Sequence, residues 1–229
     1  LLSEEKILSL EIKKLQKTYE GSIHRVLNIS DVTFSTATII RILGINGIGK
    51  TTFLSIISGL SNFEGKISIN GIEIHENYQK YLSMTAFVGN KLFLYDFLTG
   101  NEMIDFVQNA VNFQSNIDND LWDFINKSGL SEYLNIMTKD MSLGTKQKLS
   151  IVLALLASPK VLLLDEPFVN LDEPSKKALI KILKQRSKQK EILTIYATHS
   201  KESDIEHLAD KTVRLINDKK DGAYLISQL

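Results

Sequence analysis

A glycine-rich turn between two apolar segments is the part of this sequence best suited to chemistry. Residues 44–49 read GINGIG and precede Lys50 and Thr51, which matches G-x-x-x-x-G-K-[ST] in the strand, loop and helix setting that the pattern requires. Glycines let successive backbone N–H groups converge on phosphate oxygens, and a helix N-terminus adds partial positive charge. The motif predicts a nucleotide site in which Lys50 reaches the β- and γ-phosphates and the Thr51 hydroxyl ligates Mg²⁺. Further nucleotide contacts are expected from Asn46, Gly47, Gly49 and Thr52.

Two adjacent carboxylates follow an apolar run later in the chain. Residues 161–164 read VLLL and precede Asp165 and Glu166, so both acids fall at the C-terminal end of a buried strand, where α/β sheets bind ligands. Beside the phosphate loop, Asp165 is expected to hold Mg²⁺ through its water shell and Glu166 to polarise the attacking water. Taken alone, the pair is equally well explained as two solvated acids at a strand end.

The elements that must position these groups alternate between strand and helix. Runs at 39–43, 161–167 and 192–199 are typical of buried strands. Strands that alternate with helices imply a mainly parallel sheet covered on both faces. The helices expected after these strands cover residues 50–58, 174–188 and 201–208, and a hairpin-like pair, KTVRLIND and GAYLIS, closes the chain.

The first third of the chain favours antiparallel strands. Residues 7–19 alternate loosely between apolar and polar and are expected to form an edge strand, and residues 26–34 predict a second strand. Residues 66–74 predict a hairpin that turns at Asn70-Gly71. The next expected elements are a short helix over 76–83 and a strand over 84–89. From residue 91 to 158 helical periodicity prevails, which predicts a helical insertion.

The composition excludes several classes of partner and chemistry. Lys and Arg together number 27, as do Asp and Glu, so the formal net charge is zero and no bulk attraction to nucleic acid or anionic lipid is expected. The absence of cysteine excludes disulfides and Cys-ligated zinc. No apolar run reaches the roughly 18–20 residues needed to span a bilayer, and the first ten residues lack the basic region of a signal peptide. We expect a protein that is soluble by itself.

A third motif gives the set a family resemblance. Residues 141–147 read MSLGTKQ directly before a helix, where Ser142 and Gly144 offer a hydroxyl, backbone N–H groups and a helix N-terminus to an anion. Alone, this is an ordinary helix N-cap. Together with the phosphate loop and the two carboxylates, it resembles the LSGGQ signature of ATP-binding-cassette (ABC) transporter ATPase subunits, and the SLGTKQ variant resembles bacterial export-type members. The resemblance covers essentially the whole chain.

The resemblance assigns roles to further residues. Residues 169–172, VNLD, resemble the D-loop of the family. His199 resembles the switch histidine that contacts the γ-phosphate and orients the catalytic Glu166, and Tyr19 resembles the aromatic residue that stacks on adenine. Lys50 completes the set of residues expected to be catalytic.

Two residues depart from the family pattern, and a third is unusual in its own strand. Leu143 stands where the commonest signature has glycine, and Asn90 stands at the Q-loop position, which usually holds Gln. The Asn90 amide is expected to ligate Mg²⁺ or to hold the water through its oxygen. Arg41 interrupts an otherwise apolar strand, and the sequence suggests no function for it.

The resemblance implies an α/β fold with a P-loop NTPase core, a mainly parallel sheet, an N-terminal antiparallel β subdomain and a helical subdomain insertion. Residues 1–229 would form a single ABC nucleotide-binding domain. Its RecA-like core and β subdomain would comprise 1–90 and 159–229, and its helical subdomain 91–158.

The same resemblance implies a function. Two such subunits, alike or different, would sandwich two Mg-ATP between one subunit's phosphate loop and the other's signature, and ATP hydrolysis would drive integral-membrane transporter subunits. The expected location is cytoplasmic, peripheral on the inner face of the cell membrane, with no nucleic-acid partner. One alternative is a soluble ABC ATPase that clamps nucleic acid or ribosomes. Another is a small-molecule kinase, which leaves MSLGTKQ and the D-loop without a role.

An apolar segment after Asn90 is a candidate docking surface. Residues 91–101 read KLFLYDFLTGN and must bury apolar surface, either in the helical core or against another protein. In the resembling family the neighbouring groove receives a helix of the membrane subunit. We expect at least two of Phe93, Tyr95 and Phe97 to remain partly exposed.

Overall fold

The computed structural model describes residues 9–35, 38–111, 117–190, 192–200, 202–218 and 222–228. The N-terminal residues examined for a signal peptide lie largely outside these ranges, as do the first two residues of the predicted strand 7–19. Within the described residues, no helix is both long and apolar enough to cross a membrane.

Five strands form the parallel part of the sheet. They lie in the order β7, β8, β9, β4, β10, and each neighbouring pair is parallel. Three of them, β4, β8 and β9, are buried over nearly their whole length, as expected of strands covered on both faces. The bounds are β7 Thr85–Val88, β8 Val161–Asp165, β9 Leu193–Ala197, β4 Ile39–Leu43 and β10 Lys211–Asp218.

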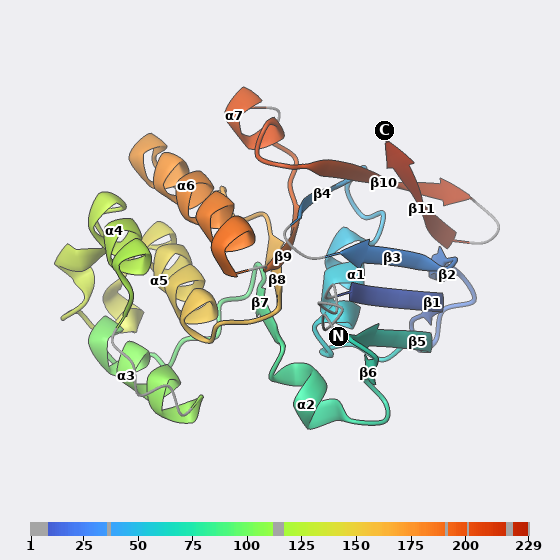
Figure 1. Ribbon diagram of the computed structural model, residues 1–229, viewed down its shortest axis with the longest axis horizontal. Coiled ribbons are helices and arrows are strands. Elements are labelled where there is room, and N and C mark those ends of the chain that lie inside the picture. Colours follow the sequence, from blue (N-terminus) through green and yellow to red (C-terminus); the bar gives the residue numbers. More distant parts are fainter. Residues whose placement is uncertain are drawn as a thin grey trace, which may run out of the picture.

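Further strands extend the same sheet beyond β10 (Figure 1), and they pair antiparallel except for β11 and β2, which pair parallel. The final hairpin joins β10 to β11, which pairs with β2, and the sheet continues through β1 and β5 to β6. The predicted turn between β5 and β6 is confirmed, and both Asn70 (φ 53°) and Gly71 (φ 78°) adopt the positive φ that a tight hairpin turn requires. The bounds are β11 Gly222–Gln228, β2 Arg25–Ile29, β1 Ser9–Thr18, β5 Glu64–Ile69 and β6 Ile72–Glu73.

Two expectations for this region are wrong. The run 26–34 is not one strand, because it breaks at the exposed Ser30 and Asp31 into β2 and β3 (Val32–Ser35). The first strand is not at an edge, because β2 and β3 pair with one side of β1 and β5 pairs with the other. Local alternation shows which face of a strand is buried, but it does not show how many neighbours the strand has.

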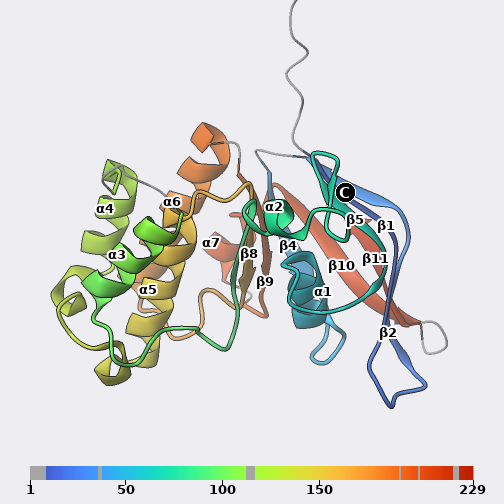
Figure 2. The same cartoon turned by 90° about the horizontal axis from the view of Figure 1, so that it is seen from below.

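The helices cover the two faces of the sheet (Figures 1 and 2). The helices α3 to α6 lie on one side of the parallel strands, and α1 lies on the other. The predicted α/β fold class is confirmed, whereas the proposed subdomain boundaries at 91 and 158 stay a prediction. The bounds are α1 Lys50–Ile57, α2 Tyr78–Leu82, α3 Gly100–Ala110, α4 Asn119–Lys127, α5 Leu143–Leu156, α6 Glu173–Lys190 and α7 Ser203–Glu206.

Successive residues of the central strands face two different hydrophobic clusters. In β8, Leu162 and Leu164 pack into the cluster shared with α3 to α6, whereas Val161 and Leu163 pack into the cluster shared with α1 and the antiparallel strands. The packing on both faces fixes these strands, and their parallel pairing places the C-terminal ends of β4, β8 and β9 at one edge of the sheet. The predicted site residues follow those ends.

Candidate functional site

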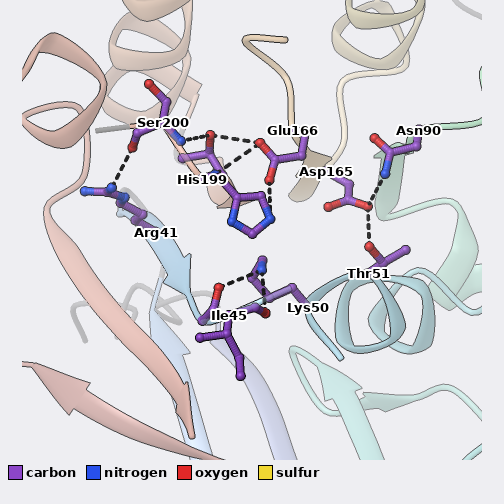
Figure 3. Close-up of polar contacts among 11 residues, drawn as sticks. Arg41, Ile45, Lys50, Thr51, Asn90, Asp165, Glu166, His199 and Ser200 are labelled. Carbon is purple, nitrogen blue, oxygen red and sulfur yellow. Dashed lines mark hydrogen bonds and ion pairs between the residues drawn. The ribbon is translucent and has the colours of Figure 1, made fainter. Parts of the chain in front are cut away.

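The glycine-rich loop connects β4 to α1 as the sequence predicts. Gly49 has φ 106°, a backbone conformation that favours glycine, and a Cβ at this position would lie in tight contact, 3.0 Å from the Leu27 side chain. Lys50 begins α1, and its Nζ donates to the carbonyls of Gly44 at 2.8 Å and Ile45 at 3.2 Å (Figure 3). The ammonium group is therefore already held inside the loop.

The charge of Lys50 is influenced by burial and by the two neighbouring acids. Desolvation lowers the pKa of Lys50, while the nearby Glu166 and Asp165 carboxylates act in the opposite direction. The lysine and both acids thus belong to one electrostatic cluster.

Oxygen-bearing side chains from three elements meet at Asp165. Its Oδ2 accepts from the Thr51 hydroxyl at 2.7 Å and from the Asn90 amide nitrogen at 3.4 Å (Figure 3). One carboxylate, one hydroxyl and one amide suit Mg²⁺, which commonly uses one or two carboxylates and completes its shell with water and substrate phosphates. The three residues predicted to ligate Mg²⁺ are brought together.

Glu166 is held in an uncommon backbone conformation by the strand beside it. Its φ of 50° lies in the left-handed region, which costs about 1–2 kcal/mol for a residue other than glycine. One carboxylate oxygen, Oε2, accepts from the Thr198 hydroxyl at 3.0 Å and from the His199 backbone N–H at 3.2 Å. The other, Oε1, lies 3.2 Å from Nε2 of the His199 ring (Figure 3). The carboxylate is therefore aimed at His199.

Tyr19 follows β1 and reaches the start of α1. Its hydroxyl lies 2.9 Å from the Thr52 hydroxyl, and Lys17 Nζ lies 5.0 Å from the ring centroid. Tyr19 is about half exposed.

These residues line one cleft of about 340 Å³. Its lining contains all but two of the predicted site residues: Tyr19, Asn46, Gly47, Gly49, Lys50, Thr51, Thr52, Asn90, Asp165, Glu166 and His199. Among the described residues that line it, neither Ser142 nor Gly144 occurs.

The signature segment lies instead at the start of α5, against the loop after β8. Ser142 is the N-cap of α5, where its Oγ accepts from the Thr145 N–H at 3.1 Å. A Cβ on Gly144 would clash with the Asn170 carbonyl, so a residue of the predicted D-loop requires glycine there.

Sequence reasoning missed two contributors to the site. Thr198 holds Glu166, and Ser200 donates its N–H to the Thr198 hydroxyl at 3.1 Å. The signal available in the sequence was the polar stretch Thr198-His199-Ser200 directly after an apolar strand.

Comparison with known proteins decides the family. Residues 27–169, more than half of the chain, match the family described as ABC transporter. The chain belongs to the ABC transporter family. The match begins in β2 and ends within the predicted D-loop, so it includes the phosphate loop, the signature and both carboxylates.

Relatives of this ABC ATPase come from bacteria and from humans. It is 34% identical to YybJ of Bacillus subtilis, named an uncharacterized ABC transporter ATP-binding protein, over 86% of each chain. It is 32% identical to human ATP-binding cassette sub-family A member 10 over 92% of this chain and 14% of the human protein. It is 30% identical to the molybdenum import ATP-binding protein ModC of Vibrio vulnificus over 87% of this chain and 54% of that protein. This ABC ATPase therefore spans only part of some relatives, and nothing in these names supports the nucleic-acid clamp.

Solved structures show the same fold. The structure titled as the ATP binding subunit of an ABC transporter superposes with a TM-score of 0.76 at 29% identity, over 90% of this chain and 85% of that one. A dimeric ABC transporter cassette, MJ0796, superposes with a TM-score of 0.75 at 21% identity, over 90% of this chain and 93% of that chain.

Proposed function

We propose that this chain is the ATP-binding and ATP-hydrolysing subunit of a membrane ABC transporter, located on the cytoplasmic face of the cell membrane. The observation that carries the proposal is the placement of Glu166 and His199 in the same cleft as Lys50, Thr51 and Asp165. A general base, a charge for the phosphates and a Mg²⁺ ligand set are the parts that ATP hydrolysis needs.

Each residue has a proposed role in that reaction. The loop N–H groups and Lys50 bind the β- and γ-phosphates, Tyr19 stacks on adenine, and Mg²⁺ is held by Thr51, Asp165 and Asn90. Glu166 accepts the proton of the attacking water, and His199 orients Glu166 and contacts the γ-phosphate. Assay of Mg²⁺-dependent ATP hydrolysis by the purified chain, and by the complete transporter, tests the proposal. ATP binding without ATP hydrolysis in the complete transporter would refute it.

We further propose that two such subunits share each ATP. The proposal is supported by the position of Ser142 and Gly144 at the start of α5, outside the cleft that holds Lys50. A helix N-terminus offers backbone N–H groups and partial positive charge to the phosphates of a nucleotide bound to another subunit.

Mixing two inactive variants tests this arrangement. Ser142→Arg is expected to leave ATP binding by the monomer unchanged but to block the dimer sandwich, and Lys50→Ala is expected to weaken binding itself. A mixed dimer retains one site with an intact phosphate loop facing an intact signature, so ATPase activity should reappear on mixing. No recovery in a mixture that demonstrably forms mixed dimers would contradict the shared site, as would loss of ATP binding in the Ser142→Arg monomer.

The segment after Asn90 supports a surface for the membrane subunits. The prediction about its exposure is confirmed, since Phe93 is 85%, Tyr95 49% and Phe97 70% exposed. The leucines of the same segment, Leu92, Leu94 and Leu98, pack against the hydrophobic core. The segment therefore has both partly buried leucines and exposed aromatic side chains. Phe93 and Tyr95 also line a mainly apolar groove of about 440 Å³ between β7, α3 and α5.

Negative charges introduced on this surface should weaken binding between the ATPase subunit and the membrane subunits. Phe93→Asp with Phe97→Asp is expected to weaken capture of the membrane subunits by about 30-fold, because buried aromatic anchors are commonly worth 2 kcal/mol or more. ATP affinity should stay unchanged, because neither side chain lines the nucleotide cleft. Co-purification from membranes and nucleotide titration measure the two effects. Trp122→Asp, a change at a 40% exposed aromatic on α4, is the matched control, and equal loss of capture in both variants would refute the surface.

The most detailed part of the proposal concerns the direction of transport, export or import. The SLGTKQ variant of the signature supports export, whereas the name of the Vibrio vulnificus relative describes molybdenum import. Reconstitution of the captured complex with ATP on the cassette side decides between them, because an exporter moves cargo away from that side.

A further inference from the structure

Arg41 is a buried cation in a strand that is otherwise apolar. It lies in the middle of β4, is 5% exposed, and is flanked by the buried Ile40 and Ile42. Removing a charge from water costs several kcal/mol unless the charge is paired and hydrogen-bonded. The hydrogen-bond partners of the Arg41 guanidinium therefore indicate its structural role.

The two contacts of Arg41 reach the segment that follows β9. Nη2 donates to the Ser200 carbonyl at 2.9 Å (Figure 3). Nη1 donates to Glu206 Oε1 at 3.1 Å. Within the described residues, Nε has no hydrogen-bond partner. Ser200 is the residue after His199, so one arm of the guanidinium holds the loop that carries the histidine.

The loop is fixed at three successive residues, from two directions. Glu166 Oε2 accepts from the Thr198 hydroxyl at 3.0 Å and from the His199 N–H at 3.2 Å, on the side of the cleft. Arg41 holds the Ser200 carbonyl from the side of β4. The His199 side chain is itself 48% exposed, so packing alone does not fix its ring.

The contact between Arg41 and Glu206 is one of the contacts that hold α7 against the sheet. The Tyr196 hydroxyl donates to the Ile205 carbonyl at 2.7 Å, which ties α7 to β9 without Arg41. In the part of the chain that the structure describes, no second donor reaches the Ser200 carbonyl. The arm that reaches Ser200 is thus the contribution peculiar to Arg41.

We propose that Arg41 is a positioning residue that holds His199 against Glu166 through the Ser200 carbonyl. This inference rests on the proposed function, in which His199 and Glu166 act together during ATP hydrolysis. Arg41 touches neither nucleotide nor water in this role.

Arg41→Met removes both hydrogen bonds and keeps a long side chain. We expect kcat for ATP hydrolysis to fall about 10- to 100-fold, because small displacements of catalytic groups have effects of this size. The dissociation constant for ATP should change by no more than about twofold, since the phosphate loop is untouched. Arg41→Lys retains one cationic donor for Ser200 and should recover part of the loss.

Two variants separate positioning from simple support of α7. Glu206→Gln removes the charge partner of Arg41 but leaves the bond to Ser200, and Tyr196→Phe removes the second tether of α7. If Arg41 acts through Ser200, both should lower kcat by less than about threefold, well below the effect of Arg41→Met. An effect of Arg41→Met on kcat no larger than that of Tyr196→Phe would overturn the proposal.

A second readout does not depend on turnover. In the histidine-labelled protein without nucleotide, the His199 ring signals, identified with His199→Ala, should move in Arg41→Met and Arg41→Lys and stay in place in Tyr196→Phe. Unmoved signals in Arg41→Met would overturn the proposal, and Arg41→Leu, which also lacks a donor for the Ser200 carbonyl, decides if Arg41→Met does not fold. If the complete transporter bound ATP without hydrolysing it, the proposed function would fail, while the ring signals would still decide whether Arg41 positions His199.

Discussion

Glu166→Gln is expected to bind Mg-ATP as well as the unaltered chain and to hydrolyse it about 100- to 10,000-fold more slowly. The glutamine oxygen still accepts from Thr198 and the His199 backbone, so the side chain should keep its place. It cannot accept the proton of the attacking water, so the hydrolysis step becomes much slower. ATP should then trap a dimer. Size-exclusion chromatography detects the dimer, and a separate kinetic assay measures kcat.

The same chemical change elsewhere provides the control for this result. Glu173 opens α6 with a side chain 69% exposed and paired with Lys176, so Glu173→Gln should hydrolyse ATP normally. Turnover in Glu166→Gln equal to that of the control would exclude Glu166 as the general base.

Lys50→Ala is expected to impair binding instead of turnover alone. It removes the charge that faces the β- and γ-phosphates, and truncating one partner of a close, buried charge pair costs about 2 kcal/mol or more. The dissociation constant for Mg-ATP should rise by at least about 30-fold, as measured by nucleotide titration.

A lysine away from the cleft separates this effect from a general loss of positive charge. Lys80 lies on α2 and is exposed, so Lys80→Ala should bind Mg-ATP normally. If Lys50→Ala bound Mg-ATP as tightly as Lys80→Ala, the loop would not be the phosphate site.

The parts of the site that follow from local sequence were predictable. The apolar run before Gly44 and the run before Asp165 each end at a strand terminus, and parallel strands bring their C-terminal ends to one edge. The phosphate loop, the two acids and His199 therefore meet as expected. Asn90 also reaches Asp165, at 3.4 Å, although its side chain is shorter than the usual glutamine.

The parts that depend on distant contacts were not predictable. The position of β1 inside the sheet is set by pairing with β5 and with β2, which no local alternation encodes. Arg41 was recognised as unusual in the sequence, but its partners Ser200 and Glu206 lie 159 and 165 residues away. A buried charge in a sequence shows that a partner must exist without showing which residue it is.

The alternation of residues in the central strands has a thermodynamic consequence. Leu162 and Leu164 of β8 belong to one hydrophobic cluster, and Val161 and Leu163 belong to the other. Because β8 contributes side chains to both clusters, unfolding of one cluster disrupts the packing of the other. We therefore expect the two clusters to unfold together, as one cooperative unit. Asp165, the last residue of that strand, therefore depends on the stability of both layers.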